Sequence, residues 1–185
     1  MKYILILAIA TVVSVSSFSQ ELSKKEQRKL NKELKKEQKA EEEALQTELV
    51  HLMVHYRRFV LEADQLKDKR GNTTHVVSTI NFVAVDSING VLQVGSNSYV
   101  GRNGVGGITV EGPISNYKST YNEKSRTYSV SYVIMTRTGT YDVIMTVFPS
   151  GRADATIGSA WPGKLNYIGN LVPPAVSKVY KGSSW

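Results

Sequence analysis

The chain contains no cysteine among its 185 residues. This absence excludes disulfide bonds and thiolate metal sites, and it also excludes the cysteine to which a lipid is attached in bacterial lipoproteins. Histidine is scarce as well, with three residues in the whole chain. A catalytic arrangement of nucleophile, histidine and orienting group therefore has little material to be built from.

The motifs of nucleotide-binding proteins and of serine hydrolases are also missing. Residues 94–112 carry six of the 14 glycines, but they match neither G-x-G-x-x-G nor a phosphate-binding loop. A strand-like sequence, ITVEG, follows where both motifs require a helix. No G-x-S-x-G sequence occurs. We interpret the glycines as shaping a bulged connection between neighbouring strands, and we expect no nucleotide cofactor.

Metal ligands and paired carboxylates are sparse. His51 and His55 lie one helical turn apart, with Glu48 or His75 as conceivable third ligands, but Leu52 stands where zinc proteases carry their catalytic Glu. We therefore predict no metal and no enzymatic activity. The strand region has few acidic residues, and two that faced each other would instead indicate a hydrolase of envelope glycans. These acidic residues are Asp86, Glu111, Glu123, Asp142 and Asp154.

The first nineteen residues have the pattern of a secretory signal peptide. Lys2 precedes an apolar run over residues 3–15, and small residues at Ser17 and Ser19 suit a cleavage site. The run is shorter than the roughly 20 residues that span a bilayer, so we do not expect an integral membrane protein. We predict export to the periplasm or the exterior, and attachment to the cell envelope is an open alternative. We expect no nucleic acid partner.

The positive charge is concentrated in one segment. Between Ser23 and Lys39 there are eight basic and three acidic residues. Ser23 and Glu26 form a capping-box pattern, and no Gly or Pro interrupts the chain until Gly71. We predict a charged helical arm over residues 20–44, which either is simply solvated or contacts an anionic envelope surface.

Residues 45–185 are predicted to form one β-rich domain that begins with a docked helix over 45–61. Apolar residues recur at helical spacing in this first stretch and should face the domain. They are Leu45, Leu49, Leu52, Tyr56 and Phe59 or Val60.

Alternating apolar residues and turn residues predict about eight short antiparallel strands. The expected strands cover residues 76–85, 91–94, 108–110, 114–117, 128–134, 141–148, 152–158 and 165–168. Asn89-Gly90 is expected to be the turn of a hairpin, and Gly112-Pro113 is expected to separate two strands. The short connections favour a meander that is either a barrel, lipocalin-like in general shape, or a sandwich.

Small β-barrels and sandwiches bind ligands with aromatic and polar side chains on their mouth loops. We therefore take the aromatic and polar residues in or beside the predicted loops as candidate ligand-binding residues. They are Tyr99, Arg102, Asn103, Tyr117, Tyr121 and Trp161.

Several segments together resemble a known family. They are FVLEAD at 59–64, INFVAVD at 80–86, GRNGVGGITVEG at 101–112, YDVIMTVFPSGRADATI at 141–157 and KLNYIGNLVP at 164–173. From about Glu48 to Gly182, their order and spacing resemble a family of secreted proteins from Gram-negative gut-type bacteria, domain of unknown function 4251. Family members often carry Leu-Pro-Tyr-Phe-Gly where this chain has NSYVG at 97–101. The resemblance implies an exported β-rich domain and no particular activity.

The sequence thus favours a non-enzymatic binding domain. Its expected ligand is a small apolar molecule, an envelope glycan or a protein partner. One alternative is a structural or interaction protein that acts through its charged arm, and a second is the glycan hydrolase.

Overall fold

The computed structural model describes residues 24–96, 98–159 and 164–184. The predicted signal peptide and Trp161 lie outside the described residues. The chain divides into two compact units: the first ends at Gln38 and the second begins at Lys39. Helix α1 covers Lys24–His55. The charged arm was predicted to end at residue 44, which lies inside this helix.

In the first unit, the described residues 24–38 are all helical and all exposed. Their sequence explains the helix, because Lys, Glu, Gln, Leu and Arg are good helix formers and neither Gly nor Pro occurs among them. In the described part of the chain, no helix is long and apolar enough to cross a membrane.

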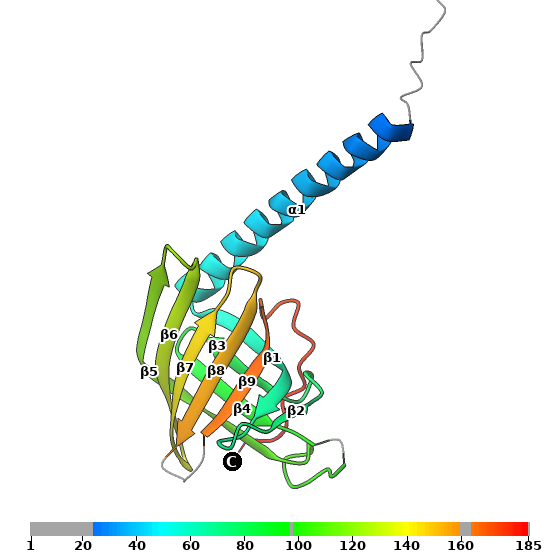
Figure 1. The fold of residues 1–185 in the computed structure, drawn as a ribbon. Helices are drawn as coiled ribbons and strands as arrows, with labels where there is room; N and C mark the ends of the chain where they lie inside the picture. The colour runs from blue at the N-terminus through cyan, green and yellow to red at the C-terminus, as the bar shows by residue number, and fades with distance from the viewer. Residues whose placement is uncertain (1–23, 97, 160–163, 185) are drawn as a thin grey trace, which may run out of the picture. The chain divides into compact units, whose positions relative to one another are not determined.

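The described residues of the second unit form nine antiparallel strands (Figure 1). They are β1 (Arg58–Lys67), β2 (Thr73–His75), β3 (Phe82–Asp86), β4 (Asn89–Val94), β5 (Ile108–Asn122), β6 (Thr127–Thr136), β7 (Gly139–Val147), β8 (Arg152–Ser159) and β9 (Lys164–Val172).

Consecutive strands pair in the order β1-β3-β4-β5-β6-β7-β8-β9. The first and last of these also pair, with Val60 opposite Val172 and Lys67 opposite Asn166. The sheet is therefore a closed eight-stranded antiparallel barrel, which settles the choice between barrel and sandwich. The short β2 is an extra strand that pairs with the end of β1. Closure leaves the eight barrel strands without the long unpaired edge of an open sheet.

The barrel interior is filled by apolar side chains from all eight strands, with α1 packed against them. Val50, Met53 and Val54 of α1 are at most 4% exposed and belong to the same core as the strand residues. The end of α1 thus closes one end of the barrel (Figure 1). Large aromatic residues such as Phe59 and Tyr167 fill the interior, as expected for a barrel of eight strands.

Two expectations for the start of the domain were wrong. The helix ends at His55, not at residue 61, and Arg57 adopts a positive φ of 54° that no α-helix tolerates. Phe59 and Val60 belong to β1, a strand that the sequence analysis missed. The segment 58–67 has enough buried positions on both faces that its apolar residues fit a helical spacing as well as a strand.

The hairpin of β3 and β4 is confirmed, but its turn lies at Ser87 and Ile88, because Asp86 pairs with Asn89. Gly90 is inside β4, where a Cβ would lie 3.0 Å from the Ile134 side chain. The absence of a side chain at residue 90 therefore serves packing inside the barrel.

Gly112-Pro113 also does not separate two strands. β5 runs straight through these residues, and its partner changes from β4 to β6 there. A Cβ on Gly112 would overlap the carbonyl oxygen of Met135, so this glycine permits a close approach of two backbones. The predicted strand at 76–85 is also shorter than expected, since residues 76–81 are irregular.

The C-terminal segment covers the outer face of β4 and β5, where it is fastened by Gln93. This side chain is fully buried, and its amide nitrogen donates to the carbonyl oxygens of Ile80 (3.0 Å) and Tyr180 (2.9 Å). Its amide oxygen accepts from the backbone N–H of Gly182 (2.8 Å) and the hydroxyl of Thr109 (3.0 Å). A buried amide with this many partners holds the segment in one position.

Candidate functional site

An apolar groove lies where α1 ends at the barrel. The chain turns sharply after the helix, at Arg57, whose carbonyl oxygen accepts from the backbone N–H of Ser87 (2.7 Å). The carbonyl oxygen of Val54, near the helix end, accepts from the hydroxyl of Tyr117 (2.8 Å) and from the backbone N–H of Arg57 (3.3 Å). The last two helical turns are thereby held in place beside β1.

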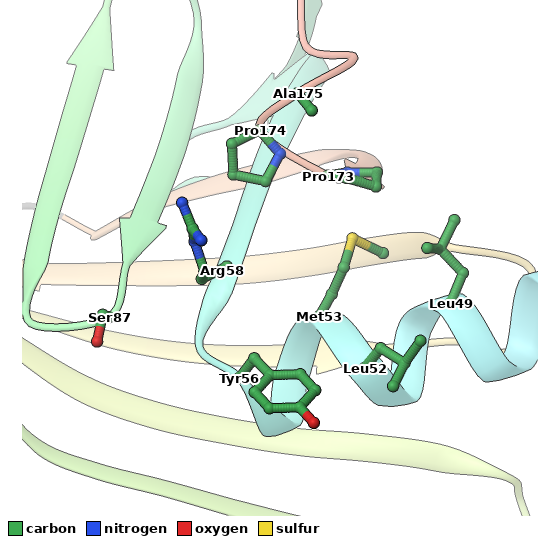
Figure 2. Close-up of a pocket in the computed structure, with 9 residues that line it drawn as sticks. All are labelled: Leu49, Leu52, Met53, Tyr56, Arg58, Ser87, Pro173, Pro174 and Ala175. Atoms are coloured by element: carbon green, nitrogen blue, oxygen red, sulfur yellow. The ribbon is translucent and has the colours of Figure 1, made fainter.

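Three separate segments form the walls of the groove (Figure 2), which has a volume of about 630 Å³. The helix and the start of β1 supply one side, and the residues after β9 supply the other. The lining residues are Leu49, Leu52, Met53, Tyr56, Arg58, Ser87, Pro173, Pro174 and Ala175.

The apolar character of the groove comes from residues that the helix does not bury in the barrel. Met53 is 4% exposed and forms part of the floor, whereas Leu52 and Tyr56 are 40% and 64% exposed. Leu45 is 65% exposed, so most of the apolar face that we predicted to dock on the domain faces solvent. The correction has a simple reason: Val50, Met53 and Val54 form a second apolar face on the same helix, and this second face is the one that packs into the barrel.

One charged side chain lines the groove. The Nε atom of Arg58 lies 3.0 Å from a carboxylate oxygen of Asp86, and both side chains are more than half exposed. An ion pair at this exposure is screened by water and contributes little to stability. Its cation remains accessible to an acidic group on a bound molecule.

A second, smaller pocket of about 140 Å³ opens into the barrel from the strand ends of β4, β5, β7, β8 and β9. Leu92, Val94, Ile108, Tyr141 and Tyr167 are among its lining residues. Ligand pockets for drug-sized molecules typically measure about 300–1,000 Å³, so this pocket is smaller than such ligands need.

The predicted site residues do not form one site. Tyr99, Arg102 and Asn103 lie on the connection between β4 and β5. Tyr99 is 70% exposed, but Asn103 is 2% exposed. The Asn103 side chain donates to the Thr109 hydroxyl (3.1 Å) and accepts from the backbone N–H of Val105 and Gly107 (both 3.2 Å). The Asn103 side chain therefore stabilises the conformation of the β4–β5 connection. Trp161, the remaining candidate on a loop, lies outside the described residues.

Tyr117 and Tyr121 lie on β5 beside the helix end. The Tyr117 ring stacks on Tyr132 with 5.8 Å between centroids, and the Arg57 guanidinium lies 4.7 Å from its centre. Burial raises the pKa of Tyr117 to about 12, although the charge of Arg57 opposes this change. Tyr117 is thus part of the joint between helix and barrel, whereas Tyr121 is 41% exposed.

The two helix histidines belong to a surface row of rings. His51 and His55 stack with 6.0 Å between centroids, and a ring nitrogen of His51 is hydrogen-bonded to the Tyr128 hydroxyl. Tyr121 packs against Tyr128 at 4.8 Å. In the part of the chain that the structure describes, no three His, Asp or Glu side chains gather as metal ligands.

The groove was missed because its walls come from distant parts of the sequence. Pro173-Pro174 is far from α1 in the sequence, and the pairing of β9 with β1 brings it beside the helix. The available signal was an excess of apolar residues between Leu49 and Tyr56, more than one helical face accommodates.

Comparison with known proteins agrees with the fold. No curated protein matches the chain. A crystal structure of a DUF4251 family protein from Bacteroides eggerthii DSM 20697 is 30% identical, with a TM-score of 0.63. The match covers 77% of this chain and 97% of that one. The family model described as domain of unknown function (DUF4251) matches residues 37–171, and the chain therefore belongs to the DUF4251 family.

Proposed function

We propose that the protein is an exported, non-enzymatic binding module that recognises an apolar segment of a protein partner in the groove beside α1. The observation that carries this proposal is the groove itself, an apolar concavity at the surface of a barrel whose interior is packed. Contiguous exposed apolar patches on soluble proteins often mark the sites at which these proteins bind a partner or ligand.

The composition of the groove favours a protein over a small molecule. Tyr, Met and Arg are the residue types enriched in the cores of protein interfaces, and Tyr56, Met53 and Arg58 all line the groove. Three further exposed apolar residues are close in sequence to lining residues: Leu45, Ile88 and Val176 are 65%, 69% and 64% exposed. A protein partner can cover side chains on several segments at once, whereas a small ligand covers few.

The two other ligand classes find less support. The pocket that opens into the barrel measures about 140 Å³, which is too small for a drug-sized apolar molecule. A glycan hydrolase would need two carboxylates facing a substrate. Asp86 is engaged with Arg58, and Glu111 with Lys181 at 2.8 Å, so two of the five candidate carboxylates have structural partners.

The proposal is tested by site-specific photo-crosslinking of the exported protein in its natural host. A photoreactive residue at Leu52 should crosslink a discrete envelope protein, whereas one at Ile144, 60% exposed on β7, should not. Ala175→Arg on the opposite wall should abolish the crosslink, and Ile144→Arg should leave it intact. The purified partner should then bind the Ala175→Arg variant at least about tenfold more weakly, a loss of about 1.4 kcal/mol.

Equal crosslinking from both positions, or a Leu52 crosslink that survives Ala175→Arg, would reject the groove as the binding site. A lipid that co-purifies in the groove would instead identify a small apolar ligand. Thermal unfolding of each variant controls for the integrity of the barrel.

A second candidate function is attachment of the protein to an anionic envelope surface through residues 24–38. The observation that favours it is the full exposure of this basic segment. This second candidate function does not depend on binding in the groove.

A further inference from the structure

The charged residues of the first unit are sorted around the helix. At 3.6 residues per turn, each residue advances by about 100° around the axis. All seven basic residues of the segment 24–38 then fall within an arc of about 140°. They are Lys24, Lys25, Arg28, Lys29, Lys32, Lys35 and Lys36, and we call them the cationic face.

The other residue types occupy separate sectors. Glu26, Glu33 and Glu37 together span an arc of about 40° beside the cationic face. Leu30 and Leu34 follow, on the side of the helix opposite the centre of the cationic face. All of these side chains are exposed, so burial against the described residues does not account for the sorting.

This arrangement is unfavourable for an isolated helix. The cationic face puts like charges four residues apart at Lys24 and Arg28, Lys25 and Lys29, Arg28 and Lys32, and Lys32 and Lys36. Such pairs repel, whereas alternating signs at the same spacing stabilise a solvated helix. A helix selected only for solubility would gain from mixing its charges, and this one separates them.

We propose that the cationic face binds the anionic phospholipid headgroups of a membrane surface. The inference rests on the second candidate function and identifies its partner. The face is about 20 Å long, because it extends over residues 24–36 at a rise of about 1.5 Å per residue, and it can contact several headgroups at once. Clusters of four to eight Lys and Arg on a helix are typical of segments that bind anionic lipid.

The position of the leucines decides the mode of contact. An inserting amphipathic helix buries a broad apolar face, rich in Trp, Phe or Leu, below the headgroups. Here the apolar face has two residues, and it points away from the surface that the cations contact. The attachment is therefore electrostatic and lies on the membrane, without insertion.

The test measures co-sedimentation of the chain from Gln20 onward, the predicted mature protein, with lipid vesicles. Binding should be strong with vesicles of phosphatidylcholine and phosphatidylglycerol and absent with phosphatidylcholine alone. It should disappear when salt rises from about 0.1 M to about 1 M, because the screening length falls from about 10 Å to about 3 Å.

A charge-swapped variant separates the cationic face from net charge. Exchanging the neighbours Lys25 and Glu26, Lys32 and Glu33, and Lys36 and Glu37 (K25E, E26K, K32E, E33K, K36E, E37K) keeps the composition and net charge. It places three acidic residues at the centre of the cationic face. We expect binding to weaken more than about tenfold.

Two further variants complete the design. Leu30→Gln with Leu34→Gln should bind as well as the wild type, since these residues face away. Lys25→Gln, Lys32→Gln and Lys36→Gln together should weaken binding while retaining good helix formers. Circular dichroism controls for helix content in each variant.

Undiminished binding of the charge-swapped variant would overturn the proposal in favour of net charge alone. Binding to soluble polyphosphate but not to vesicles would also overturn it, because the ligand would be a free polyanion. Ala175→Arg should leave vesicle binding unchanged. A negative result for lipid binding by the cationic face can therefore be told apart from a negative result for partner binding in the groove.

Discussion

Two tyrosines inside the barrel show how a single hydroxyl group affects stability. Tyr132 and Tyr167 are 2% and 0% exposed, and burial raises the pKa of both. The hydroxyl of Tyr167 donates to the carbonyl oxygen of Gln93 (3.2 Å). The hydroxyl of Tyr132 has no hydrogen-bond partner among the described residues. A buried polar group without a partner costs about 1–3 kcal/mol.

We therefore expect Tyr132→Phe to stabilise the protein by about 1 kcal/mol, because it removes an unsatisfied hydroxyl. Tyr167→Phe should destabilise it by about 1 kcal/mol, because a hydrogen bond is lost. Urea unfolding of both variants measures the free energy of unfolding. A loss of stability in Tyr132→Phe would show that this hydroxyl is satisfied in solution.

The connection between β4 and β5 was interpreted from its glycines as a shaped segment, and the structure supports this for particular residues. Gly101, Gly104 and Gly106 adopt positive φ values of 59°, 78° and 72°. A Cβ on Gly106 would also overlap the carbonyl oxygen of Tyr99, whereas a Cβ on Gly104 would meet nothing within 4 Å. The glycine at 106 is therefore required for space as well as for backbone angle.

These two glycines form a matched pair for a test at the scale of this element. Gly104→Ala should cost about 1–2 kcal/mol, the strain of a left-handed residue. Gly106→Ala should cost a further 1–3 kcal/mol or so, because its Cβ must displace the backbone of residue 99. Equal losses of unfolding free energy in the two variants would contradict the inference that Gly106 is needed for its backbone to lie against the backbone of Tyr99.

At the scale of the whole molecule, the C-terminal segment is held against strands that precede it by about half of the chain. The Lys181 ammonium lies 2.8 Å from a carboxylate oxygen of Glu111, and Ser184 also donates to this carboxylate. The hydrogen bond and charge of Lys181 lower the pKa of Glu111 below its usual 4.5. The charged form of Glu111 is thus favoured in the folded state.

The sign of the resulting pH dependence follows from this direction. The stability from Glu111 is fully present above pH 4.5 and is lost as the pH falls through the lower pKa of the folded state. The pair is partly exposed, so its contribution is about 1 kcal/mol or less. Glu111→Gln should lower the melting temperature at pH 7, and the difference from the wild type should vanish near pH 3. A difference that persists at acid pH would contradict the assignment.

Local patterns in the sequence determined much of this protein. Alternation of side chains predicted most strands, and the expected strand at 128–134 lies within β6, because period two is inherent to a strand with one buried face. Helix propensity likewise predicted the charged arm, and the order and spacing of several segments indicated the family.

Only the tertiary structure decided the closure of the barrel and the position of the groove. Pairing of β1 with β9 joins residues that are 99 to 112 positions apart, from Lys67 with Asn166 to Val60 with Val172, and no local pattern encodes that contact. The same closure chose Val50 and Val54, in place of Leu45 and Leu52, as the buried side of α1. A helix with two apolar faces can bury either one, and the shape of the barrel end selects between them.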